Sequence, residues 1–71
     1  METIKLLSVV ALLEDIPSHG LVRGQVGTII ETLRSEAYEV EFSDDDGRTY
    51  ATLALKPEQF IVLHHNQPKA A

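Results

Sequence analysis

Two glycines, three residues apart, open the most β-branched segment of this chain and restrict what it can fold into. Gly24 and Gly27 precede the run Thr28-Ile29-Ile30. Glycine reaches φ > 0 and lets backbones approach closely, as a tight turn into a strand requires. The segment from Leu21 to Glu31 therefore predicts a loop that turns into a strand. It indicates a fold and does not indicate a reaction.

The clearest single strand lies further along the chain. Tyr38 to Ser43 alternates apolar and polar residues, which places one set of side chains on the core face and Glu39 and Glu41 on the other. The core-face set includes Tyr38 and Phe42, which leaves few aromatic side chains for a groove that binds proline-rich peptides. The predicted strands are Val9 to Leu13, Val26 to Leu33, Tyr38 to Ser43, Arg48 to Leu55 and Phe60 to His64.

The segments between these strands carry turn signals. Asp44 to Gly47 has the composition of a hairpin turn, in which Gly47 takes a left-handed conformation. The blurred apolar pattern of Arg48 to Leu55 indicates a bulge or burial on both faces. Lys56 to Gln59 predicts one helical turn. Helical spacing competes with a strand over Val9 to Leu13, and the break at Pro17 favours the strand.

These elements predict an all-β fold, a small five-stranded SH3-like barrel with one short helical turn before the last strand. The length of 71 residues allows one domain, expected over residues 1–65, with a flexible tail over residues 66–71. The chain has no cysteine and its apolar N-terminal run is too short to cross a bilayer. We therefore expect a cytoplasmic protein without a membrane contact.

Several segments together resemble a family of small bacterial proteins called domain of unknown function 4926. The similarity covers roughly residues 8 to 63. It implies an SH3-like fold, a cytosolic setting and a place among the small partner-binding proteins of two-gene bacterial systems, and it implies no functional residues. The segment Arg23 to Ile29 also resembles the Kyrpides-Ouzounis-Woese motif of ribosomal and transcription proteins. The segments that carry the family resemblance are residues 9–17, 20–29, 38–42, 46–49 and 55–59.

Charge is the feature with most functional content. The formal net charge is −5, and only six Lys and Arg residues are present, so nucleic acid is an unfavourable partner. Seven of the eleven acids fall within residues 31–46. The expected partner-binding residues form a negative ridge: Glu39, Glu41, Asp44, Asp45 and Asp46. Such a ridge either keeps a small domain soluble or docks a basic partner.

No constellation for catalysis, a metal or a cofactor is visible. The acidic triplet does not have the spacing of a calcium-binding EF-hand loop. His64 and His65 are adjacent and would point to opposite faces of a strand. His19 has Glu14 and Asp15 nearby in sequence, but no assignable nucleophile.

The sequence therefore predicts a non-enzymatic acidic module that binds another protein, of the antitoxin or immunity-like kind in a two-gene bacterial system. The alternative is a ribosome- or RNA-associated accessory protein that uses the Gly24 to Ile29 element. Neither of these two functions predicts an oligomeric state.

Overall fold

The computed structural model describes residues 4–64, which form five antiparallel strands and two short 3-10 turns. The sheet order is β4-β3-β2-β1-β5, so the sheet ends at β4 and β5. In chain order the elements are β1 (Val9–Leu12), η1 (Pro17–His19), β2 (Val26–Leu33), β3 (Ala37–Ser43), β4 (Thr49–Leu55), η2 (Pro57–Gln59) and β5 (Phe60–Leu63).

The predicted all-β fold is confirmed. Both ends of every predicted strand lie within one residue of the ends of an observed strand. Strand ends shift by this amount because their last hydrogen bonds are irregular. Leu13 lies outside β1, yet its N–H still donates to the Gln59 carbonyl at 2.9 Å. The turn η1 was not predicted, and the proposed tail over residues 66–71 lies outside the described residues.

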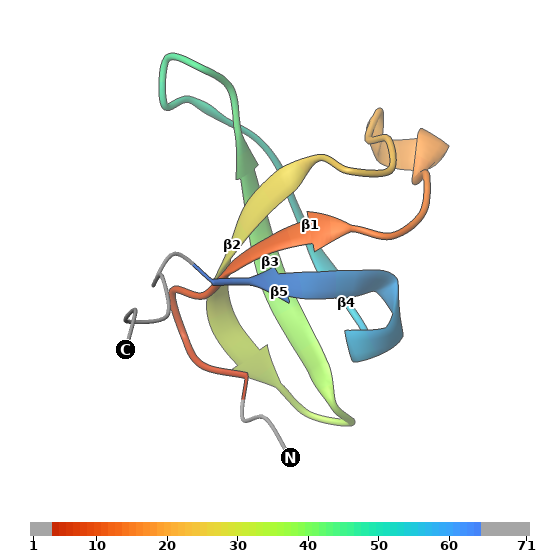
Figure 1. Ribbon diagram of the computed structural model, residues 1–71, viewed down its shortest axis with the longest axis vertical. Helices are drawn as coiled ribbons and strands as arrows, with labels where there is room; N and C mark the ends of the chain where they lie inside the picture. The colour runs from red at the N-terminus through yellow and green to blue at the C-terminus, as the bar shows by residue number, and fades with distance from the viewer. Residues whose placement is uncertain (1–3, 65–71) are drawn as a thin grey trace, which may run out of the picture.

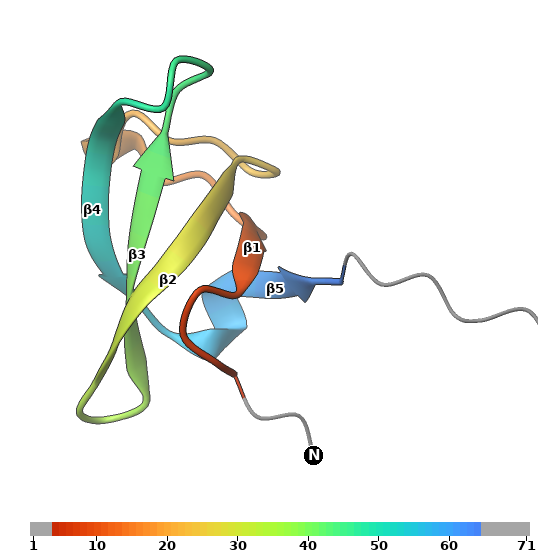
Figure 2. The ribbon, with the colours of Figure 1, turned by 90° about the vertical axis from the view of Figure 1, so that its left-hand side faces the viewer.

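The sheet is strongly twisted and bent, so that β5 and β1 cross in front of β3 and β4 (Figures 1 and 2). The rings of Tyr38 on β3 and Phe60 on β5 meet edge to face, with centroids 5.9 Å apart. The core therefore lies inside the bend, where side chains from all five strands meet. Its buried residues are Val10, Leu12, Leu21, Ile29, Val40, Phe42, Leu55 and Phe60.

The glycines have two different structural roles. Gly24 has a φ of +91° and Gly47 a φ of +82°, with open space where a Cβ would stand. Gly27 lies within β2, where a Cβ would come within 2.8 Å of the side chains of Val40 and Phe42. Gly24 and Gly47 are thus needed for backbone conformation, and Gly27 is needed for space.

Two irregularities interrupt the ladders on either side of β3. The β2–β3 register shifts between Ile29 and Glu31, and the β3–β4 register shifts between Phe42 and Ser43. The second shift leaves Tyr50 without a register partner on β3, which favours a bulge over burial on both faces, the two alternatives that the blurred pattern of Arg48 to Leu55 indicated. The phenol of Tyr50, which lies at this shift, contacts the amide of Gln25 in the loop before β2.

Candidate protein-binding surface

Glu39 and Glu41 lie on the outer face of the sheet, as the alternation of β3 predicts. Their neighbours Val40 and Phe42 are fully buried, whereas both glutamates are only half-buried. Within residues 4–64 the structure records no ion pair for either carboxylate. Two negative charges are therefore fixed on a strand and have no compensating cation in the described part of the chain.

A third glutamate joins them through the bulge in β2. Glu31 pairs directly with Glu39 across the β2–β3 ladder, because Ile30 is accommodated in the register shift. Like charges opposite one another on a sheet are unfavourable. Glu31 is one of the seven acids clustered within residues 31–46, but no feature of the sequence predicts the bulge that places it opposite Glu39.

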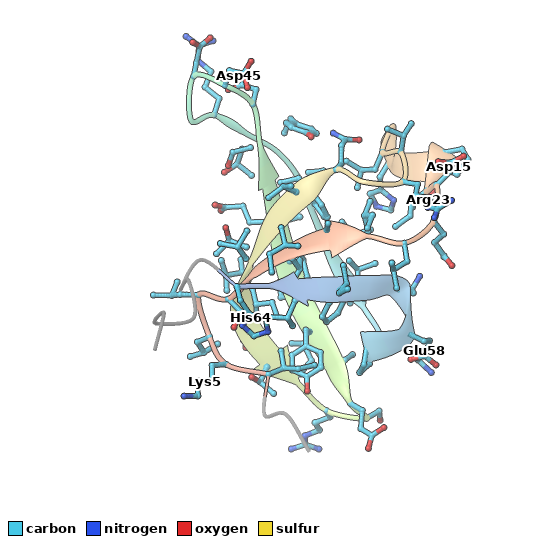
Figure 3. All side chains as sticks on the ribbon, in the orientation of Figure 1. Lys5, Asp15, Arg23, Asp45, Glu58 and His64 are labelled. Carbon is cyan, nitrogen blue, oxygen red and sulfur yellow. The ribbon has the colours of Figure 1, made fainter. Side chains whose placement is uncertain are left out.

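The acidic turn lies apart from these glutamates. The β3–β4 hairpin projects beyond the rest of the sheet, and Asp45 lies at its tip (Figure 3). At about 3.3 Å per residue, the tip stands on the order of 13 Å along the strand from Glu41. The predicted ridge is thus divided into an acidic group on the face of β3 and an exposed group at the hairpin tip.

Asp44 stabilises its own turn. Its Oδ1 accepts hydrogen bonds from the backbone N–H groups of Asp46 and Arg48, both at 2.9 Å. The Asp44 carbonyl also accepts the N–H of Gly47 at 3.0 Å. This is the turn chemistry expected of aspartate. All three aspartates are exposed, and within residues 4–64 the carboxylates of Asp45 and Asp46 have no hydrogen bond.

The outer face changes from acidic to apolar beyond β2. Glu41 pairs with Thr28, Thr28 pairs with Val9, and Val9 pairs with Leu63, which gives one continuous row across four strands. The next row of the same face consists of Val26, Ala11 and Ile61. Val26 is 49% exposed and Ile61 is 52% exposed. Sequence reasoning missed this apolar surface because β1 and β5 are apolar on both faces and show no alternation.

The loop before β2 is held by polar contacts. Asp15 Oδ1 accepts the Arg23 backbone N–H at 2.8 Å, and Gln25 Oε1 accepts the Val22 N–H at 2.7 Å. The Gly24 to Ile29 element therefore begins beside a carboxylate. This arrangement adds negative charge where phosphate binding would need positive charge.

Among the described residues, His19 is not brought together with Glu14 or Asp15 into a site. The exposed His19 contacts Ser18 Oγ through Nδ1 at 3.1 Å, whereas Glu14 accepts the Gln59 side-chain amide at 3.1 Å. His64 follows β5, and His65 lies outside the described residues. Over residues 4–64 no group of three or more His, Cys, Asp or Glu side chains is placed to hold a metal ion.

No helix among residues 4–64 combines the length and the apolar character needed to cross a bilayer.

Comparison with known proteins gives one match. The model of a family described as Domain of unknown function (DUF4926) matches residues 6–62, which include β1 to β4 and all of β5 except Leu63. No curated protein and no solved structure matches the chain.

Proposed function

The chain belongs to the DUF4926 family, whose description assigns no function, and we propose from its own residues that it is a non-enzymatic module that binds a basic protein surface. The proposal rests on the acidic face of β3, which consists of Glu39 and Glu41 on β3 and of Glu31, the β2 residue that pairs with Glu39. Glu31, Glu39 and Glu41 lie on adjacent outward positions without an ion pair in the described residues. A partner that supplies Lys or Arg there would relieve the repulsion between Glu31 and Glu39 and gain complementary contacts.

The hairpin tip contributes to the approach of such a partner. Asp45 and Asp46 are exposed, and Asp45 lies at the tip of the hairpin that projects beyond the sheet (Figure 3). The whole chain carries a net charge of −5. A concentrated negative field attracts a basic partner over a Debye length of about 8 Å at physiological ionic strength. The tip thus accelerates encounter, and the β3 face forms the contact.

We place the protein as the small acidic member of a two-gene bacterial system, in an antitoxin or immunity-like role, on an SH3-like scaffold in the cytoplasm. An acidic module of this kind neutralises a basic effector by covering its charged surface. This role needs no cofactor and no catalytic residue on the module.

The test begins with a tagged chain expressed in its host and the recovery of its direct partner by affinity capture and mass spectrometry. Association with the purified partner is then followed by surface plasmon resonance over a salt series. We expect the on-rate to fall steeply with salt, and to fall further in the double variant Glu39→Lys/Glu41→Lys. The matched control is Glu36→Lys/Glu58→Lys, which makes the same change in net charge at two exposed positions off the β3 face.

The control separates the β3 face from the overall charge. If both double variants slow association equally, net charge alone drives the encounter and the β3 face is not the contact. An on-rate indifferent to salt would remove the electrostatic basis of the proposal. Recovery of RNA in place of a basic protein would favour the ribosome-associated alternative through the Gly24 to Ile29 element.

A further inference from the structure

The apolar half of the outer face is larger than β1 and β5 alone. Leu7 precedes β1, and its N–H donates to the Ile29 carbonyl at 2.7 Å, so its backbone lies beside Ile29 of β2. The Leu7 side chain is 73% exposed, and that of Ile30 is 40% exposed. Ile30 and the outward residues of β1, β2 and β5 form an apolar surface, with the exposed Leu7 at its edge beside Ile29; the surface consists of Val9, Ala11, Val26, Ile30, Ile61 and Leu63.

Leu7 is held on the surface in an unfavourable conformation. Its φ is +68°, in the left-handed region that bulky side chains rarely adopt. Glycine or asparagine would occupy this position with less strain. Burial of the side chain does not compensate for the strain, because the side chain is exposed. An exposed leucine kept at a conformational cost is the kind of feature found at functional sites.

Charge on the same face selects the occupant. The apolar surface is bordered on its β3 side by Glu31, Glu39 and Glu41, with Thr28 between Glu41 and Val9. A second copy of this chain would bring the same unpaired acids toward this border. A segment with an apolar stripe and Lys or Arg along one side would cover the apolar residues and pair with the acids in one orientation.

We propose that the β5–β1–β2 face and the acidic face of β3 together form one docking site for a basic amphipathic segment of a partner protein. This inference rests on the proposed function and extends it. The glutamates set orientation and rate of association, and the apolar surface provides the burial that slows dissociation. The partner's basic side chains lie along only one edge of its apolar stripe.

The probe is a synthetic amphipathic helix of about 18 residues, or five turns. It carries one leucine stripe, lysines along one side of that stripe and glutamines elsewhere. A scrambled peptide of the same composition has no stripe, and a second control replaces every lysine by glutamate. Binding to the full chain is measured by fluorescence anisotropy, and the contact is mapped from changes in backbone amide NMR signals.

We expect the striped lysine peptide to bind with amide signals shifting along β1, β5 and the outer face of β3. Ile61→Thr keeps a β-branched residue in the strand and should weaken binding about tenfold or more, since it removes an aliphatic group that the bound peptide would bury. Leu7→Asn should also weaken binding while leaving thermal stability unchanged or higher, because asparagine tolerates φ > 0. Val22→Thr makes a similar apolar loss at an exposed loop position and should leave binding unchanged.

The outcomes distinguish this inference from the proposed function. If the scrambled peptide binds as well as the striped one and Ile61→Thr has no effect, charge alone acts: the docking site is wrong while the proposed function stands. If neither lysine peptide binds at about 1 mM, both proposals fail at this face. Dimerisation of the free chain in sedimentation equilibrium that Ile61→Thr abolishes would assign the face to a second copy and overturn the inference.

Discussion

Gly27 and Gly24 illustrate at the residue scale how two identical residues are required for different reasons. Gly27→Ala places a Cβ within 2.8 Å of Val40 and Phe42, two fully buried side chains that have little room to move. We expect it to destabilise the fold by about 1–3 kcal/mol through overpacking. Gly24→Ala meets open space but forces a left-handed backbone on alanine, at a cost of about 1–2 kcal/mol.

Asparagine variants, measured by urea titration, distinguish the need for positive φ at Gly24 from the lack of space at Gly27. Gly24→Asn should recover part of the stability lost in Gly24→Ala, because asparagine tolerates positive φ. Gly27→Asn should be worse than Gly27→Ala, because it adds volume where space is already absent. Equal stability of Gly27→Ala and the parent would show that the close approach to Phe42 relaxes freely.

The sequence supports some residue roles better than others for a physical reason. Alternation along β3 correctly separates the buried Val40 and Phe42 from the outward Glu39 and Glu41, because a strand repeats every two residues. The hydrogen bonds of Asp44 follow from local turn preference. The exposure of Leu7 has no such local signal, since a leucine in an apolar run reads as core.

At the scale of elements, the β2 bulge creates a pairing that can be improved. Glu31 lies opposite Glu39, and neither has an ion pair within the described residues. Glu31→Lys converts a repulsive cross-strand pair into an attractive one. We expect the free energy of unfolding to rise by about 0.2–1 kcal/mol, as measured by urea titration at low salt.

A charge-matched control locates this effect in the ladder. Glu36→Lys makes the same change in charge in the turn between β2 and β3, where Glu36 is exposed and has no strand partner. It should stabilise the protein less than Glu31→Lys. If the two variants are equally stable, the gain comes from net charge and the Glu31–Glu39 pairing contributes nothing of its own.

The positions of the five strands were predictable within one residue because apolar patterning and turn residues agree along most of the chain. The pairing of elements was less accessible. A bulge moves every later residue of its strand by one register position, so the position of Glu31 opposite Glu39 depends on a tertiary detail at Ile29 and Ile30. The apolar face beside it was hidden because Val9–Leu12 and Phe60–Leu63 contain no polar residue to mark the outer side.

At the scale of the whole molecule, charge sets how the fold responds to its solvent. The net charge is −5, and no Lys or Arg side chain within residues 4–64 forms an ion pair with an acid. The compact state therefore brings acids together without local compensation, and self-repulsion of this kind destabilises folding. Added salt shortens the Debye length from about 10 Å at 0.1 M to about 3 Å at 1 M and screens this repulsion.

The free energy of unfolding should accordingly increase with sodium chloride between about 0.05 and 0.5 M. Urea is the suitable denaturant because it is uncharged, whereas guanidinium would screen the acids itself. The control is Glu39→Lys/Glu41→Lys, whose two reversals each remove a negative charge and add a positive one, and so bring the net charge from −5 to −1. Its stability should depend less on salt than that of the parent, which separates screening of the acids from general effects of salt on apolar burial. A parent protein that loses stability as salt rises would mean that its charges attract on balance, and that the acids of β2 and β3 already have cationic neighbours in solution.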